Sequence, residues 1–260
     1  MTGRVYLVGA GPGAPDLLTV RAARLLAAAD IVFHDALVHP ETLALAERAE
    51  KVAVGKRCGR HSTVQAFINK RLVDAARKHA VVVRLKGGDP MLFGRAQEEI
   101  DALRAARIEF EVVPGVTAAL AAAADLGASL TRRGVSRNVV FATPRVGDGE
   151  ATSDWAEPLA AADTGVVYMG AGEAAAIAAT LIARGKPTSL PVVAVENASL
   201  PGSRCWVTTL GELPRLADEA FTGPVVLLLG EALAAAAADP NRVRTEFLEV
   251  AEAHLLRVAM

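Results

Sequence analysis

Short apolar runs recur along the chain, and helix-like segments separate many of them. Half of these runs end in glycine or a charged residue. In the first half these runs cover residues 4–9, 30–35, 51–55, 80–85 and 108–114. Apolar runs of this length are typical of strands that are buried on both faces of a parallel sheet. Their alternation with helical segments predicts an α/β fold.

Helix boundaries can be predicted from residues whose side chains cap helix ends. Thr19 is expected to cap a helix that runs to about Ala29. Ser62 and Gln65 have the spacing of a capping box, which predicts a long helix ending near residue 79. A further helix is expected over residues 95–106.

The second half of the chain has a less regular pattern. A helix over 115–127 is expected to begin at Thr117 and end at Gly127. Strands are expected over 138–143, 164–170, 190–198, 204–210 and 223–230. Because some of them lack an intervening helix, we expect a mixed sheet. The predicted organisation is an α/β domain over 1–115, a second α/β domain over 116–240 and a helical tail over 241–260.

Composition and charge exclude several classes of protein. Hydrophobic residues make up 52% of the chain, but no uncharged stretch reaches the roughly 20 residues of a spanning helix. The N-terminus lacks a signal-peptide pattern, and a net charge of −1 gives no general attraction to nucleic acid or membrane. Cys58 and Cys205 have no metal-ligand spacing, and the five histidines are scattered. We expect a cytoplasmic protein without a metal.

Glycines follow several of the predicted strands. Glycine at such a corner either makes a tight turn or lets another group approach the backbone closely. Ligands of α/β proteins bind at the carboxyl ends of the strands, so several such corners at one sheet edge predict a pocket lined by backbone. The residues concerned are Gly9, Gly11, Gly87, Gly88, Gly115 and Gly170.

The first glycine loop also fits a dinucleotide-binding fingerprint. Gly9, Gly11 and Ala14 match G-x-G-x-x-A, and an aspartate, Asp30 or Asp35, lies about 20 residues further on. In that fold, however, the helix begins at the glycines and points its N-terminus at the pyrophosphate. Here two prolines follow the first glycines and the helix is expected only after residue 19, which disfavours a nicotinamide-dependent oxidoreductase.

Two clusters of cations interrupt this pattern, over residues 55–61 (GKRCGRH) and 131–137 (TRRGVSR). Each is either a solvated loop or part of a local anion-binding site.

Six segments, taken together and in order, resemble those of the uroporphyrinogen-III C-methyltransferases, which belong to the tetrapyrrole methylase family. They are VYLVGAGPGAPDLLT, VGKRCGRH, VVRLKGGDPMLFGR, FEVVPGVTAA, LTRRG and YMG, and the resemblance extends over residues 5–231. The third segment is the most specific. Some relatives are fused to a dehydrogenase–chelatase module, which we do not expect here because the chain starts at the methylase motif.

The resemblance implies a fold and an activity. The family has two α/β domains with the active site in the cleft between them, and it is usually homodimeric. It transfers methyl groups from S-adenosylmethionine to two pyrrole carbons of uroporphyrinogen III, which gives precorrin-2 for siroheme and cobalamin, with S-adenosylhomocysteine as co-product. The implied partners are a small tetrapyrrole and a second copy of the chain.

The resemblance also assigns residues to the cofactor. A backbone-lined site suits a cationic sulfonium, because carbonyl oxygens and weak CH···O contacts can orient its methyl group. At one of these positions, Ala198, relatives carry glycine. The cofactor-binding residues implied are Pro12, Gly87, Gly88, Asp89, Leu92, Thr117, Ala118, Met169 and Ala198.

Three residues match family positions near the chemistry. Asp35 is predicted to act as a base or to orient the substrate, and Arg95 and Glu98 are predicted to contact the substrate as a pair. The substrate carries an acetate and a propionate on every ring, so arginines and lysines are expected to bind it. The candidates are Lys56, Arg57, Arg60, Arg132, Arg133 and Arg137.

Two positions depart from the family pattern. Ala14 stands where many relatives have aspartate, and Pro144-Arg145 stands in place of the last two residues of a TGH motif. Either departure would affect binding of the substrate rather than binding of the cofactor. The alternatives are another precorrin methyltransferase, a methylase of diphthamide or ribosomal RNA, the oxidoreductase above and a non-catalytic binding module.

Overall fold

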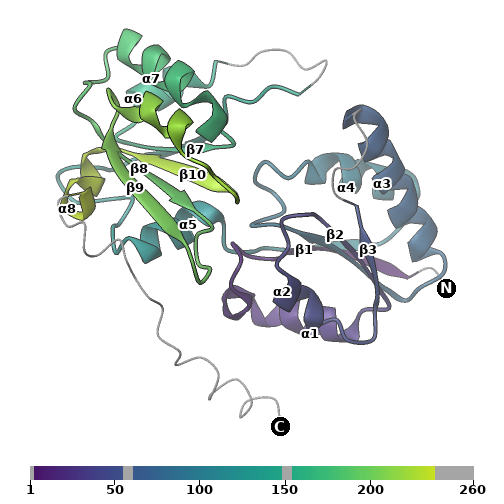
Figure 1. The fold of residues 1–260 in the computed structure, drawn as a ribbon. Coiled ribbons are helices and arrows are strands. Elements are labelled where there is room, and N and C mark those ends of the chain that lie inside the picture. Colours follow the sequence, from purple (N-terminus) through teal and green to yellow (C-terminus); the bar gives the residue numbers. More distant parts are fainter. Residues whose placement is uncertain (1–2, 55–60, 148–153, 238–260) are drawn as a thin grey trace.

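The chain forms two five-stranded sheets, one from each half of the sequence (Figure 1). A computed structural model describes residues 3–54, 61–147 and 154–237. The predicted tail over 241–260 lies outside the described residues. The α/β fold class and the second, mixed sheet are confirmed, whereas the domain limits stay a prediction.

The first sheet is entirely parallel, with strand order β3-β2-β4-β1-β5. Helices cover both of its faces, as the apolar strand pattern requires. On one face α3 and α4 pack around Leu72 and Leu103, and on the other α1 packs through Leu26. The strands are β1 Arg4–Gly9, β2 Ile31–His34, β3 Glu50–Ala53, β4 Val81–Lys86 and β5 Phe110–Val113, and the helices are α1 Val20–Ala28, α2 Pro40–Ala44, α3 His61–Ala76 and α4 Ala96–Ala105.

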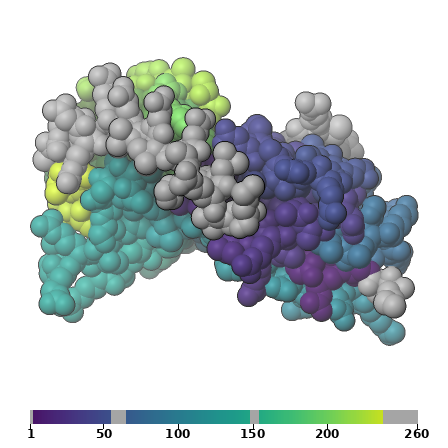
Figure 2. Space-filling model, turned by 90° about the horizontal axis from the view of Figure 1, so that it is seen from below, coloured from purple at the N-terminus to yellow at the C-terminus, as the bar shows by residue number. Residues whose placement is uncertain are grey.

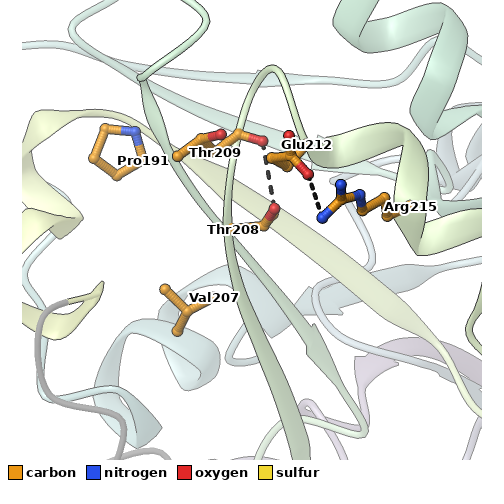
Figure 3. Close-up of a pocket in the computed structure, with 6 residues that line it drawn as sticks. All are labelled: Pro191, Val207, Thr208, Thr209, Glu212 and Arg215. Carbon is orange, nitrogen blue, oxygen red and sulfur yellow. Dashed lines mark hydrogen bonds and ion pairs between the residues drawn. The ribbon is translucent and has the colours of Figure 1, made fainter.

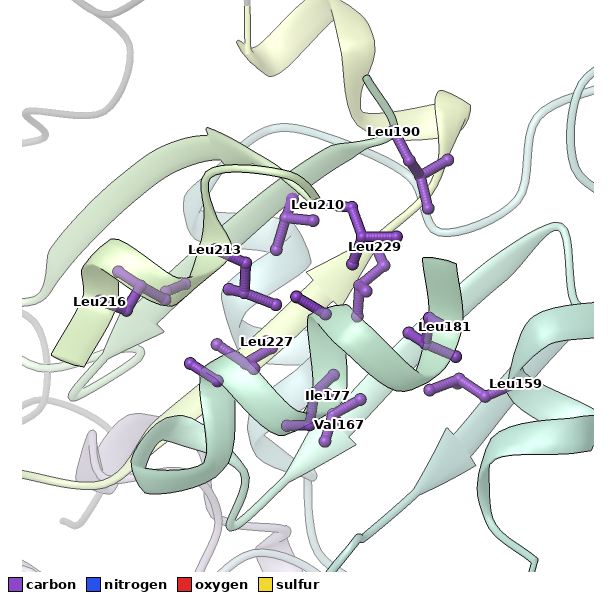
Figure 4. Packing of buried hydrophobic residues seen from close by; sticks show 14 of the residues in the cluster. Leu159, Val167, Ile177, Leu181, Leu190, Leu210, Leu213, Leu216, Leu227 and Leu229 are labelled. Atoms are coloured by element: carbon purple, nitrogen blue, oxygen red, sulfur yellow. The ribbon is translucent and has the colours of Figure 1, made fainter. Parts of the chain in front are cut away.

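The second sheet has the order β6-β7-β10-β8-β9, in which only the β6–β7 pair is parallel. Helices α6 and α7 pack on one face of the sheet around Ile177 and Leu181 (Figure 4), and α5 packs on the other. The strands are β6 Val139–Ala142, β7 Thr164–Tyr168, β8 Pro191–Glu196, β9 Arg204–Thr209 and β10 Val225–Leu229, and the helices are α5 Ala118–Asp125, α6 Ala156–Ala161, α7 Ala174–Ala183 and α8 Ala234–Ala237.

Helix caps agree only in part with the sequence predictions. Thr19 caps α1, because its hydroxyl accepts a hydrogen bond of 3.1 Å from the N–H of Ala22. Gly127 follows α5 with a φ of 59°, as expected of a helix-ending glycine. The capping box at Ser62 is wrong, since α3 begins at His61 and the Gln65 side chain bonds to Asn69 and Glu99. Helices α2, α6, α7 and α8 were not predicted.

The two halves of the chain form two lobes in the space-filling view (Figure 2). Over the described ranges, no helix combines the length and apolarity that crossing a membrane would require.

Candidate functional site

The predicted glycine corners of the first sheet lie at one edge. Strands β4, β1 and β5 are neighbours and parallel, so their carboxyl ends come together. Gly11 and Gly88 are joined by two backbone hydrogen bonds, of 3.2 Å from Gly11 N to Gly88 O and 2.8 Å from Gly88 N to Gly11 O. The sequence prediction of a shared edge is therefore correct for these strands.

Two of these glycines serve the packing of one backbone on another. A Cβ added at Gly9 would lie 2.6 Å from the N and Cα of Gly115, and one added at Gly115 would overlap the carbonyl oxygen of Gly88. Real Cβ atoms do not approach backbone this closely. Gly9 and Gly115 are therefore needed for the strand ends to meet. At these two corners the group that approaches the backbone closely is another strand end and not a ligand.

Gly170 is a correction to the predicted shared edge, because it belongs to the other sheet. It follows β7, and a Cβ there would lie 2.7 Å from Val167 and 2.8 Å from Ile177. The absence of a side chain at Gly170 leaves space for the core of the second lobe and contributes nothing to the glycine-lined edge of the first sheet.

Gly87 differs from its neighbours. An added Cβ would meet only the Cβ of Leu37, at 3.4 Å, which is ordinary contact. Among the described residues we find no hydrogen-bond partner for the Gly87 N–H or C=O. A half-buried glycine with open space above it and free backbone groups fits a ligand that binds main-chain atoms.

Asp89 fixes the turn that follows. Its Oδ1 accepts a hydrogen bond of 2.8 Å from Met91 N, and its Oδ2 accepts one of 2.9 Å from Gly115 N. The carboxylate thus ties the segment after β4 to the segment after β5. Leu92, another predicted cofactor residue, lies in the same turn and donates its N–H to the carbonyl of Asp89.

Loops of the second sheet meet this edge. The N–H of Ala14 donates a hydrogen bond of 3.1 Å to the hydroxyl of Ser199, and Gly13 packs against the side chain of Leu200. The Phe93 ring lies 5.3 Å from that of Tyr168. We call the meeting segments, residues 9–15, 87–95, 114–119, 168–170 and 197–200, the junction. Apart from Pro144 and Arg145, every predicted cofactor position and departure from the family pattern lies in it.

Tyr168 connects the junction to helix α5. Its hydroxyl lies 2.6 Å from the hydroxyl of Thr117 and accepts a hydrogen bond of 3.1 Å from Ala119 N. Burial raises the pKa of the Tyr168 phenol above its ordinary value. Thr117 does occupy the N-cap position of α5, but its side chain bonds Tyr168 instead of capping the helix.

Strained backbone is concentrated in the junction. Six non-glycine residues of the described chain have positive φ angles, and five of them lie in the junction. Each such conformation costs about 1–2 kcal/mol for a residue with a side chain. The five are Phe93, Arg95, Met169, Asn197 and Ser199. Met169 is 45% exposed, whereas Ala198, between two of the strained residues, is buried.

The three candidate catalytic residues are held by charged partners. Asp35 follows β2 and accepts a hydrogen bond of 2.5 Å at Oδ1 from Nη2 of Arg84. Arg95 donates from Nε and Nη2 to the two carboxylate oxygens of Glu98, at 2.7 and 2.9 Å. Arg95 and Glu98 are thus a bidentate pair, and a substrate carboxylate would have to displace Glu98 to bind Arg95 in the same way.

Sequence reasoning missed the charges behind Asp35. Arg84 and Lys86, on β4, and Glu99, on α4, are all at most 2% exposed. Burial lowers the pKa of Lys86, and the nearby Arg84 lowers it further. Residues 84 and 86 point to the same face of the strand, so two charges at this spacing in an apolar run were the available signal.

Three of the candidate substrate cations, all in the segment before β6, lie away from the junction. Arg132, Arg133 and Arg137 are exposed in the loop before β6, and Arg137 N bonds Asp163, which precedes β7. Since β6 and β7 are parallel, this loop lies at the opposite end of β7 from Met169, and this disfavours its predicted role. Lys56, Arg57 and Arg60 lie outside the described residues.

Two surface pockets lie away from the glycine-lined edge. One, of about 460 Å³, is formed beside the start of β8 and the end of β9, and includes Thr209, Glu212 and Arg215 (Figure 3). The other, of about 530 Å³, is largely apolar and lies along α5 and β6, with Leu120 and Phe141 in its lining. The interdomain cleft that the resemblance implies stays a prediction. No group of three metal-ligating side chains occurs in the described part of the chain.

Comparison with known families separates the tetrapyrrole methylase interpretation from the dinucleotide-binding one. The profile of the Tetrapyrrole (Corrin/Porphyrin) Methylases matches residues 4–214. The chain belongs to the tetrapyrrole methylase family. This confirms the resemblance and removes the dinucleotide interpretation of the first glycine loop. The structure agrees, because a 3₁₀ turn over Pro15–Leu17 separates that loop from α1.

Individual tetrapyrrole methylases support this assignment. The siroheme synthase of Azotobacter vinelandii is 46% identical over 231 residues, or 88% of this chain, and the chain spans half the length of that relative. The uroporphyrin-III C-methyl transferase of Thermus thermophilus, solved with S-adenyl homocysteine, is 41% identical, with a TM-score of 0.78 over 90% of this chain and all of that one. A cobalt precorrin-4 methyltransferase of cobalamin biosynthesis is 27% identical, with a TM-score of 0.78 over 88% of this chain and 95% of that one.

Proposed function

We propose that this chain transfers methyl groups from S-adenosylmethionine to ring carbons of uroporphyrinogen III and so forms precorrin-2. The observation that carries the proposal is the similarity to the Thermus thermophilus enzyme solved with S-adenyl homocysteine, which extends over that whole chain. The free backbone and open face of Gly87 support it, because they suit a ligand held by main-chain atoms.

The residues at the junction fit this cofactor. Gly87 would bind it through its own N–H and C=O, Gly88 would lie against it, and Asp89 would hold the turn in place. Pro12, Leu92, Thr117, Ala118, Met169 and Ala198 would complete the site. When bound, the cofactor supplies an electrophilic methyl group on a cationic sulfur.

The side chains of this protein then have two tasks. The first is to position a pyrrole carbon in line with the methyl group, where orientation contributes most of the rate. The second is to accept the proton that the methylated ring loses, and Asp35 is the proposed acceptor. Arg95 and Glu98 would orient the substrate carboxylates. The arginines of residues 131–137 are weaker candidates for substrate binding, because they lie at the opposite end of β7 from the junction.

The direct test is to incubate the purified protein with S-adenosylmethionine and uroporphyrinogen III under anaerobic conditions and to identify the product by mass. We expect a dimethylated tetrapyrrole and S-adenosylhomocysteine. Asp35→Asn should abolish most turnover and leave cofactor binding intact by calorimetry, whereas Asp101→Asn, at an exposed carboxylate, should change neither. Absence of methylated product from the unmodified protein would refute the proposal.

A second candidate is methylation of a later corrin intermediate, favoured by the similarity to the cobalt precorrin-4 methyltransferase. It predicts cofactor binding without turnover of uroporphyrinogen III, and turnover of a precorrin. The lower identity, 27% against 41%, makes it the second choice.

We also propose that the protein is a cytoplasmic homodimer. Family membership supports this assembly. Sedimentation velocity should give the mass of two chains of 27.0 kDa, and a monomer at micromolar concentration would exclude it.

A further inference from the structure

A row of four charges, alternating in sign, leads from the interior of the first lobe to Asp35. Lys86 donates to both oxygens of Glu99, at 3.0 and 3.1 Å. Arg84 Nε donates to Glu99 Oε1 at 3.0 Å, and Arg84 Nη2 donates to Asp35 Oδ1 at 2.5 Å. Glu99 is completely buried, whereas the side chain of Asp35 is 32% exposed. The row therefore begins in the core and ends at the surface.

Stability alone does not explain such a row. Burying ions removes them from water, and apolar side chains of similar size are often as stable in their place. The neighbouring core positions on this face of the sheet, Val82 among them, are apolar. The charges lie at the carboxyl end of β4, directly before the glycine-lined edge. Their position suggests a function in the site rather than in the fold.

The guanidinium of Arg84 is held at three points. Besides Glu99 and Asp35, it donates from Nη1 to the carbonyl of Leu85 at 3.1 Å. Glu99 is itself held by Lys86 and by Gln65, at 3.3 Å. The planar guanidinium reaches these three acceptors with N–H donors in fixed directions, whereas an ammonium is a compact charge whose donors rotate. Glu99 and the Leu85 carbonyl thus fix the orientation of the Arg84 guanidinium independently of its bond to Asp35.

The bond to Arg84 occupies only one oxygen of Asp35. Among the described residues we find no hydrogen bond to Oδ2. A carboxylate held at one oxygen and free at the other, with partial exposure, has the arrangement needed to accept a proton from a bound substrate.

We propose that Arg84 is a positioning residue, which, anchored by Glu99 and Lys86, holds the Asp35 carboxylate in the orientation for proton transfer. This inference rests on the proposed methyl transfer and on the role of Asp35 in it. Arg84 acts through Asp35 and does not touch the substrate.

A double-mutant cycle tests the inference. Arg84→Lys keeps the charge and removes the fork, and we expect kcat to fall by about 100-fold, the effect of a misplaced catalytic group. The KM for uroporphyrinogen III and the calorimetric affinity for S-adenosylmethionine should change by less than about threefold. In an Asp35→Asn background, Arg84→Lys should have little further effect on kcat, because the residue it positions is gone. Arg104→Lys, at an exposed pair on the same helix as Glu99, is the matched control and should leave kcat unchanged.

The result that overturns the inference is an equal loss of kcat from Arg84→Lys in both backgrounds. If Arg84→Lys does not fold, Glu99→Gln replaces it in the cycle, with a smaller fall in kcat expected and the same dependence on Asp35.

A crystal structure of the substituted protein gives a readout that does not need activity. We expect the Asp35 carboxylate to leave its present orientation or to occupy several. An Asp35 that stays in place would overturn the inference even if the unmodified chain has another substrate. Absence of methylated product from the unmodified chain, in contrast, would refute the proposed function only.

Discussion

Two kinds of glycine occur at the carboxyl edge of the first sheet. Gly9 and Gly115 have no room for a side chain, because each lies against the backbone of another strand end. Gly87 has room for one, and its own N–H and C=O have no hydrogen-bond partner within the described part of the chain. These three glycines look alike in the sequence, but of the three only Gly87 is available to a ligand.

This difference makes a prediction at the residue scale. Gly115→Ala should lower the free energy of unfolding by about 1–3 kcal/mol, the usual effect of overpacking, in urea denaturation. Gly87→Ala should change it by less than about 1 kcal/mol but weaken S-adenosylmethionine binding at least tenfold by calorimetry. Equal effects of the two substitutions on stability would show that the two glycines do not differ as described.

Single residues were predictable where the local sequence determines their role. Thr19 caps its helix through the N–H three residues later, and Gly127 ends one by its own conformation. Glu99 could not be predicted, since its partners Arg84 and Lys86 are 15 and 13 residues away and meet it only in the folded sheet. The bond between Thr117 and Tyr168 was missed for the same reason.

At the scale of elements, Glu196 joins three strands. It ends β8 and is completely buried. It accepts hydrogen bonds from Arg204 Nε on β9 at 2.7 Å and from Gly223 N before β10 at 2.7 Å. Burial alone would raise its pKa, but the backbone N–H groups of Gly223 and Thr222 and the Arg204 guanidinium outweigh that effect and lower the pKa.

The lowered pKa of Glu196 fixes the sign of a pH dependence. The carboxylate stabilises the fold fully above its ordinary pKa of 4.5, and this stabilisation is lost as the pH falls through the lower pKa of the folded state. Glu196→Gln should therefore reduce the free energy of unfolding by about 2 kcal/mol at pH 7. Urea denaturation between pH 3 and 7 should show this difference shrinking below about pH 4.5. A constant difference across that range would contradict the prediction.

Elements were predicted best where apolar runs are continuous. Every strand of both sheets overlaps its predicted segment. For strands such as β4 and β10 the reason is burial on both faces, which leaves little choice of residue. Helix α7 was missed, since its alanine-rich sequence has almost no polar face and so shows no amphipathic period. The strand order and the parallel β6–β7 pair follow from packing that the local pattern does not contain.

At the scale of the whole molecule, described contacts between the lobes include Ala14 with Ser199 and Phe93 with Tyr168. Ser199 affects the stability of the protein in two opposite ways. Its hydroxyl accepts a hydrogen bond from the other lobe, while its φ of 72° is unfavourable for a residue with a side chain.

These two contributions can be separated by a pair of substitutions. Ser199→Ala keeps the strained backbone and loses the bond, so it should lower the free energy of unfolding by about 1 kcal/mol. Ser199→Gly loses the same bond but relieves the strain, so it should be more stable than Ser199→Ala by about 1 kcal/mol. In both, the amide of Ala14 should exchange with deuterium faster than in the unmodified protein. Unchanged exchange at Ala14 would mean that the bond does not hold the lobes together.

The clustering of left-handed backbone where the lobes meet has a consequence for engineering. Glycine or asparagine placed at a position such as Met169, whose side chain is exposed, should make the protein more resistant to heat, because these residues adopt that conformation readily. The same changes would relax the segments that shape the predicted cofactor site. Selection for heat resistance alone should therefore favour variants that are more stable but have a lower kcat.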